Sequence, residues 1–176
     1  MKQLLALKVN DHPGVLHRIT GLFLRRGFNI ATITVGACEE PGVSRMTILL
    51  EVADERVMDQ VRKQLAKQVD VLEVEDLTDR DAVTRELCLV RVEAPLKMRS
   101  DLHSLIQPFR AQLIDVGFET VVVEVTGSPA KIDALLDLLR PFGVLEIVRT
   151  GLAALPRERQ TGNGGTARRE ARSVEV

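Results

Sequence analysis

The chain opens on an alternating pattern from Gln3 to Asn10, the period of a β-strand with one buried face. A helix should follow, because Asp11 can cap it, Pro13 fits its first turn, and apolar residues then recur every three or four positions. The predicted apolar face of this helix consists of Val15, Leu16, Ile19, Leu22 and Phe23. Gly27 is expected to end the helix.

Two strands and a second helix complete the first half of the pattern. Residues 28–36 and 43–52 are rich in Ile, Val and Thr, and the turn residues at 39–42 predict a hairpin between them. Asp54 is expected to cap a helix, and residues 71–77 alternate again as a last strand. The apolar face of that helix consists of Val57, Met58, Val61 and Leu65. The predicted order is βαββαβ.

The same order returns from Glu86 to the end of a strand at Val148. Its predicted elements are a strand at 87–92, a helix behind Ser100, short strands at 112–116 and 120–125, a helix capped by Ser128, and a strand at 144–148. The letters themselves repeat, because EV followed by VLEV in the first half corresponds to EV followed by VLEI in the second. Matched order and matched letters indicate an internal repeat.

The predicted fold class is α+β, with two tandem ferredoxin-like βαββαβ sandwiches. We expect one domain over residues 1–78, another over 86–155, and a disordered tail over 157–176, where Gly, Arg and Glu predominate. Each domain should pack two helices on one face of a four-stranded antiparallel sheet. The other face or edge should meet a second chain, because apolar residues lie on both sides of 48–52 and 120–125.

Composition narrows the classes of function. A net charge of −1, with 24 basic and 25 acidic residues, gives no general attraction to nucleic acid or anionic lipid. Cys38 and Cys88 stand far apart, which predicts neither a disulfide framework nor a zinc site. No stretch approaches the roughly 18 to 20 apolar residues of a membrane helix, and the chain opens on a strand pattern rather than a signal peptide. We therefore expect a soluble cytoplasmic protein.

The residues that could carry chemistry form no recognisable catalytic set. His12, His17 and His103 lack metal-ligand spacing, and there is no P-loop. An RNA-recognition domain has this element order but stacks bases on sheet aromatics, and the chain has no Tyr or Trp and five Phe. The arginine-bearing glycine-rich loop of acylphosphatases is also absent. These observations disfavour an enzyme and an RNA-binding domain.

The junction from Asn10 to Val15 is the candidate ligand site of the first domain. Backbone N–H groups at a helix start can hold a carboxylate, and Gly14 would let a ligand approach closely. Taken alone, Pro13 and Gly14 are more often an ordinary helix start signal than a ligand site.

Read as a whole, residues 10–30 (NDHPGVLHRITGLFLRRGFNI) resemble the ACT domain. The stretches ITVGACEEPGVSRMTI and KQLAKQVDVLEVEDL resemble the acetolactate synthase small-subunit family in particular. The second half adds LVRVEAP, IQPFRAQLIDV, VVVEVTG, KIDALLDLL and EIVRTG, each similar to that family's C-terminal domain. The resemblance extends from the first strand to about Leu155.

The resemblance implies a homodimer of paired ACT domains that senses valine or another branched-chain amino acid. By motif match, Asp11, Gly14 and Val15 would hold the carboxylate end of the amino acid, while Asn29 and Ile30 would approach from the other protomer. The family usually has Asn at the position of Asp11. We expect the Asp11 side chain to lie near the α-ammonium of the effector or to cap the helix.

The resemblance also implies a regulatory role in branched-chain amino-acid biosynthesis, with no catalytic or metal-binding residues and no cofactor on this chain. A large catalytic subunit would carry thiamine diphosphate, Mg and FAD, and residues 86–155 would activate it. Two alternatives remain open at this point. One is a stand-alone sensor of two ACT-like domains that controls a transcriptional regulator, and the other is a small hydrolase on the same fold.

Overall fold

The computed structural model describes residues 1–52 and 55–158. These residues form two compact units, which we call unit 1 and unit 2. Unit 1 comprises Met1–Val83 together with the chain from Ala154, and unit 2 comprises Thr84–Ala153. The predicted cap at Asp54 and all but the first two residues of the predicted tail, 157–176, lie outside the described residues.

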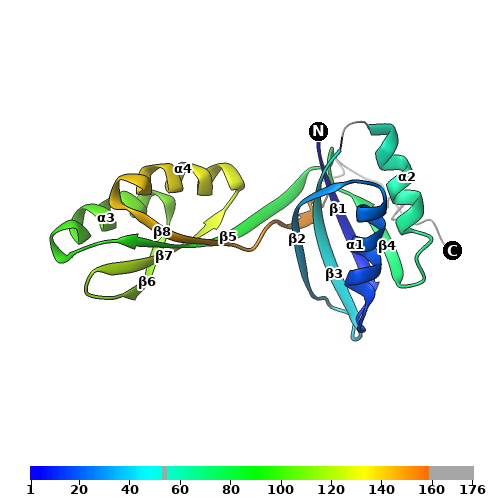
Figure 1. The fold of residues 1–176 in the computed structure, drawn as a ribbon, viewed down its shortest axis with the longest axis horizontal. Helices are drawn as coiled ribbons and strands as arrows, with labels where there is room; N and C mark the ends of the chain where they lie inside the picture. Colours follow the sequence, from blue (N-terminus) through cyan, green and yellow to red (C-terminus); the bar gives the residue numbers. More distant parts are fainter. Residues whose placement is uncertain (53–54, 159–176) are drawn as a thin grey trace, which may run out of the picture. The chain divides into compact units, whose positions relative to one another are not determined.

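Unit 1 is a four-stranded antiparallel sheet with two helices packed on one face (Figure 1). Its elements are β1 (Lys2–Asn10), α1 (Val15–Arg25), β2 (Asn29–Ala37), β3 (Val43–Glu51), α2 (Glu55–Leu65) and β4 (Val71–Asp76). The strand order is β2-β3-β1-β4. The α+β class and the βαββαβ order predicted for this half are therefore confirmed.

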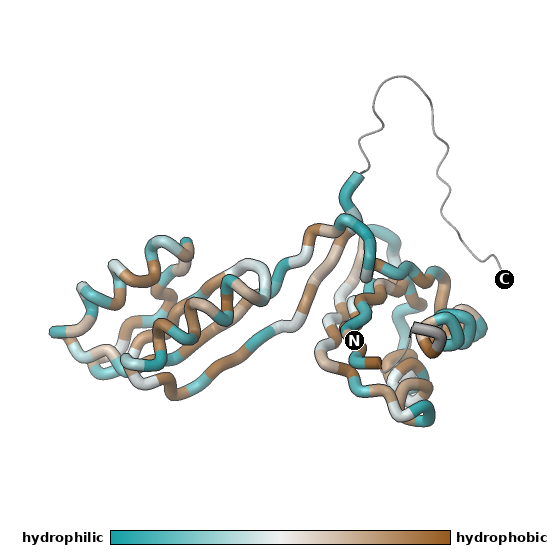
Figure 2. Tube along the Cα trace, turned by 90° about the horizontal axis from the view of Figure 1, so that it is seen from above, coloured by the Kyte–Doolittle hydropathy of each residue, from teal (hydrophilic) through white to brown (hydrophobic). Residues whose placement is uncertain are grey.

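The core of unit 1 lies between the sheet and these helices. Alternate strand residues point toward the helices, and apolar helix residues recur at helical spacing to meet them. The fully buried members include Leu5, Leu7, Ile19, Phe23, Ile48, Leu50, Met58 and Leu65. Figure 2 shows the resulting alternation of brown and teal along the helices. No helix among the described residues is long and apolar enough to span a membrane.

The opposite face of the unit 1 sheet is not left open as the sequence predicted. Ala6 is 2% exposed and Thr47 is 4% exposed, although both point away from the helices. On this face the Arg45 Nη2 donates to the carbonyl oxygen of Ala154 at 3.4 Å. The returning end of the chain therefore covers part of the surface that we expected a second chain to cover.

Unit 2 repeats the same architecture, and two helices again pack on one face of the sheet (Figure 1). The elements from β5 onward are β5 (Ala82–Glu93), η1 (Leu96–Met98), α3 (Arg99–Ile106), η2 (Gln107–Phe109), β6 (Gln112–Val116), β7 (Thr120–Gly127), α4 (Pro129–Leu139), η3 (Arg140–Phe142), β8 (Val144–Arg149) and β9 (Ala153–Pro156). The strand order β6-β7-β5-β8 matches that of unit 1 position by position.

The structure confirms one of the predicted helix starts and contradicts another. Ser128 caps α4 as expected, since its side chain accepts the Lys131 N–H at 3.3 Å. The cap expected from Asp11 is wrong, and the helix expected behind Ser100 begins one residue earlier. The first helix has Gly14 at its N-cap position with φ 92° and no side-chain hydrogen bond, and α3 begins at Arg99, before Ser100. A left-handed glycine and a preceding 3-10 turn start these helices instead.

The chain between the units differs most from the prediction. The predicted domains, 1–78 and 86–155, place the boundary near Thr78 to Arg85, but β5 already begins at Ala82 and continues through this boundary. The unpredicted strand β9 pairs with β5, and residues from Ala154 belong to unit 1 rather than to the second domain. Arg157, the first residue of the predicted tail, donates its backbone N–H to the Asp81 carbonyl at 2.8 Å. Unit 1 therefore contains both ends of the described chain, the one that begins at Met1 and the segment from Ala154 onward.

Candidate functional site

The connection from β1 to α1, which we call the β1–α1 loop (residues 11–14), leaves helix N–H groups uncapped. Gly14 has φ 92°, a left-handed conformation that disfavours residues with a Cβ, and no side chain hydrogen-bonds to the helix start. The first N–H groups of a helix have no intrahelical partner and carry the positive end of its dipole. This geometry suits a bound carboxylate.

At the start of α1, the backbone of Gly14 is exposed, whereas the side chain of Val15 is buried. No atom lies within 4 Å of the position where a Cβ on Gly14 would stand, so its surroundings are open. The Val15 side chain is only 3% exposed and packs in the core of unit 1. A ligand here would therefore meet the backbone of both residues, while the Val15 side chain fixes the start of the helix.

The Asp11 side chain is exposed, and the predicted capping role is wrong. Its backbone N–H donates to the Gly42 carbonyl at 2.8 Å and so joins the loop to the β2–β3 hairpin. Lys8 in turn holds that hairpin by hydrogen bonds to Glu39 at 2.6 Å and Glu40 at 3.1 Å. These bonds, the one to Glu39 above all, raise the pKa of the Lys8 ammonium above its usual value.

Asp70 is the buried charge of this site, at 7% exposure, and it was not among the predicted site residues. Its Oδ1 lies 2.8 Å from His12 Nε2, and its Oδ2 lies 2.7 Å from Arg18 Nε. Its carbonyl accepts the Asn10 N–H at 2.9 Å. No local pattern could have found this cluster, because Asp70 precedes β4 and its partners lie on β1, the loop and α1.

The structure does not bring Asn29 and Ile30 to the β1–α1 loop of the same chain. Asn29 pairs with Glu51, which pairs with Lys2, so it lies at the start of β1 while the loop follows its end. At about 3.3 Å per residue, these ends are roughly 25 Å apart. Asn29 Nδ2 donates to Glu51 Oε2 at 2.8 Å, and Ile30 packs against the core. One chain cannot form a single site from both segments.

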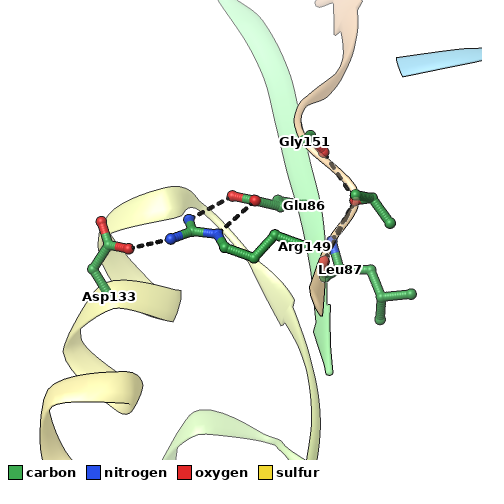
Figure 3. Close-up of polar contacts among 6 residues, drawn as sticks. Glu86, Leu87, Asp133, Arg149 and Gly151 are labelled. Carbon is green, nitrogen blue, oxygen red and sulfur yellow. Dashed lines mark hydrogen bonds and ion pairs between the residues drawn. The ribbon is translucent and has the colours of Figure 1, made fainter. Parts of the chain in front are cut away.

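Unit 2 contains a different buried charge, which ties three of its elements together (Figure 3). Arg149 on β8 donates to both oxygens of Glu86 at 2.7 Å and to Asp133 of α4 at 2.6 Å. The Glu86 side chain is 4% exposed, and its hydrogen bonds raise the pKa of the Arg149 guanidinium. Burial likewise raises the pKa of the adjacent Cys88 thiol. With both Glu86 oxygens engaged, this cluster suits stability rather than ligand binding.

Metal binding finds no support in the described ranges, 1–52 and 55–158. They contain no group of three or more His, Cys, Asp or Glu side chains that could hold a metal ion. The polar clusters at Asp70 and Glu86 each combine a carboxylate with arginine, and arginine is not a metal ligand.

Comparison with known protein families matches both halves of the chain. Residues 5–73 match the model of the AHAS small subunit-like ACT domain. Residues 85–158 match the model described as the small subunit of acetolactate synthase.

Similar proteins cover nearly the whole chain. The acetolactate synthase small subunit of Bacillus subtilis (strain 168) is 47% identical over 160 residues, which are 91% of this chain and 93% of that protein. A probable acetolactate synthase small subunit of Methanothermobacter thermautotrophicus is 49% identical over 154 residues, covering 87% and 91% respectively. The crystal structure of the Thermotoga maritima acetolactate synthase small subunit superposes with a TM-score of 0.83 at 36% identity, covering 90% of this chain and 99% of that one.

Proposed function

This chain belongs to the family of acetolactate synthase small subunits, and we propose that it stimulates a separate catalytic subunit and confers feedback inhibition by valine or another branched-chain amino acid. The observation that carries the sensing part is the β1–α1 loop, where Gly14 and an uncapped helix start present N–H groups to a carboxylate. Feedback of this kind is a coupling free energy of typically ~1 to 3 kcal/mol between two sites.

The proposed effector site lies between two copies of the chain. Strand β2 is an edge of the unit 1 sheet and pairs only with β3 there. In an antiparallel β2–β2 pair, Asn29 of one copy would approach the Ala37 end of the other. That end pairs with Ser44, next to the Asn10–Val43 pair that leads into the loop. Such a homodimer would bring Asn29 and Ile30 to Asp11, Gly14 and Val15.

The proposed division of labour assigns the two activities to different units. Unit 1 senses the amino acid, and residues 86–155 activate the partner. The catalytic subunit supplies thiamine diphosphate, Mg and FAD, and condenses pyruvate with itself or with 2-oxobutyrate. This proposal leaves the clusters of the small subunit with structural and sensing roles, consistent with the full engagement of Glu86 by Arg149.

Acetolactate formation by the large subunit of the same organism, with and without this chain and across a valine titration, tests the proposal. We expect no product from this chain alone, a higher rate when both subunits are present, and inhibition by valine, leucine or isoleucine only then. Product from the isolated chain would contradict the regulatory role. If this chain leaves the rate of the large subunit unchanged, the stimulation is wrong.

A further inference from the structure

We infer that Asp70 is a positioning residue for the proposed effector site, which it holds in its binding conformation through His12 and Arg18. The inference rests on the proposed function, because it concerns the β1–α1 loop. Asp70 itself lies behind the loop, at 7% exposure, and is therefore not placed to touch the effector.

The contacts of Asp70 reach every element that meets at the loop. Its carbonyl oxygen accepts the N–H of Asn10 at the end of β1. Its Oδ1 contacts His12 in the loop, and its Oδ2 contacts Arg18 in the first turn of α1. The other ring nitrogen of His12, Nδ1, lies 3.1 Å from the Pro13 carbonyl oxygen. Hydrogen bonds in which one partner is ionised are stronger and shorter than neutral ones, and both side-chain contacts of the Asp70 carboxylate are short.

The contacts of Asp70 hold a loop that its own local interactions do little to order. The loop contains a left-handed glycine, and its helix lacks a side-chain cap, so local interactions do little to fix it. A loop that is already ordered before binding loses less conformational freedom when the ligand arrives. Asp70 supplies that order from a distant part of the sequence, while the side chains of His12 and Arg18 remain 45% and 50% exposed.

Because Asp70 is negatively charged, two explanations of its role predict opposite changes in valine affinity when the charge is removed. If Asp70 acted only as a negative charge near the site, its neutralisation would strengthen the binding of a carboxylate. A positioning role predicts the reverse. We expect Asp70→Asn to raise the valine concentration for half-inhibition of the holoenzyme, and the Kd for valine in calorimetry, by roughly tenfold.

Asp59→Asn is the matched control, because Asp59 also pairs with an arginine but is exposed on α2. It should shift neither quantity. A double-mutant cycle of Asp70→Asn with Arg18→Met should be non-additive, the double variant binding valine no more weakly than Asp70→Asn alone. A general folding defect would instead lower the thermal midpoint and the stimulation by the chain together with the affinity.

Failure of this inference is distinguishable from failure of the proposed site. Unchanged or tighter valine binding in Asp70→Asn, or additive losses in the cycle, would overturn the positioning role if Gly14→Asp still abolishes binding. If valine binding survives both substitutions, the β1–α1 loop is not the effector site, and the proposed function fails at that point.

Discussion

The two units share one fold but differ in the connection from their first strand to their first helix. In unit 1 this connection ends in Gly14 and leaves the helix start uncapped. In unit 2, Arg99 at the start of α3 folds back over the connection. Its Nε donates to the Ala94 carbonyl at 3.1 Å, and its Nη2 donates to the carbonyls of Phe118, at 2.9 Å, and Gly117. One connection is open to a ligand, and the other is filled by a side chain of the protein.

On the proposed function, this difference assigns ligand binding to the loop and not to the sandwich. Strand order is the same in both sheets, and both cores bury the same kinds of residue. Among the described residues, no position between Glu93 and Arg99 has the positive φ that Gly14 has. A duplicated fold can therefore carry one sensing copy and one copy free to serve another purpose.

The largest expected effect comes from separating the units. Truncation after Thr78 removes all of unit 2, and stimulation of the catalytic subunit should be lost completely. The remaining chain retains the sheet and both helices of unit 1, so it should fold and bind valine. It should also be less stable than the full chain, since it lacks the Ala154 segment that Arg45 holds.

Acetolactate synthesis, calorimetry with valine and thermal unfolding of the truncated and full chains would check this. Full stimulation by the truncated chain would mean that activation resides in unit 1. Loss of valine binding with a folded core would mean that sensing requires residues beyond Thr78.

The second effect tests the open connection directly. Gly14→Asp places a carboxylate where the carboxylate of the effector should lie, and charges about 4 Å apart repel by roughly 1 to 4 kcal/mol. We expect valine inhibition to weaken at least tenfold in the holoenzyme assay. Gly14→Asn is the control, because Asn has a similar size and tolerates positive φ without the charge. Equal inhibition curves for the two variants would show that backbone strain, not charge, sets the effect.

The third effect concerns the buried charge of unit 2, the Glu86 carboxylate. Arg149→Met leaves the Glu86 carboxylate buried without its partner, and breaking buried pairs costs about 3 to 5 kcal/mol. Because Arg149 is 32% exposed, we expect the lower part of this range in the free energy of unfolding.

Arg140→Met is the control for Arg149→Met, because its exposed pair with Asp137 should contribute less than about 1 kcal/mol. Chemical denaturation of both variants measures the difference. Similar losses from the two substitutions would show that the Glu86 cluster adds no more stability than a surface pair.

The smallest effect concerns Asp11. Its exposed side chain leaves it free to meet the α-ammonium of the effector, and an attraction of roughly 1 kcal/mol in water corresponds to about fivefold in affinity. Asp11→Asn should therefore bind valine several-fold more weakly, and the difference should shrink as salt rises. Calorimetry at low and high salt checks this. Tighter binding by the Asn variant would place Asp11 beside the carboxylate instead.

Features that depend on residues close together in the sequence were mostly predicted correctly, and features that depend on distant residues were not. The strand at Gln3–Asn10, observed as Lys2–Asn10, and the helix start at Ser128–Pro129 were predicted correctly because neighbouring residues determine them. The Asp11 cap was mispredicted because Gly14 offers a competing left-handed start. Strand β9 was missed because four residues carry too little periodicity. Asp70 escaped notice because its role depends on contacts between segments far apart in the chain.

The return of the chain to unit 1 makes unit 2 an insertion in the topological sense. The Arg157 N–H reaches the Asp81 carbonyl, so the outgoing and incoming segments lie side by side where unit 1 ends. Domain insertions are tolerated where the two ends of the guest meet at one place on the host. A short linker from Val83 to Ala154 would therefore excise unit 2 and keep the strand that a simple truncation discards. The same junction could accept a fluorescent guest domain, which would turn the sensing unit into an optical reporter of its amino acid.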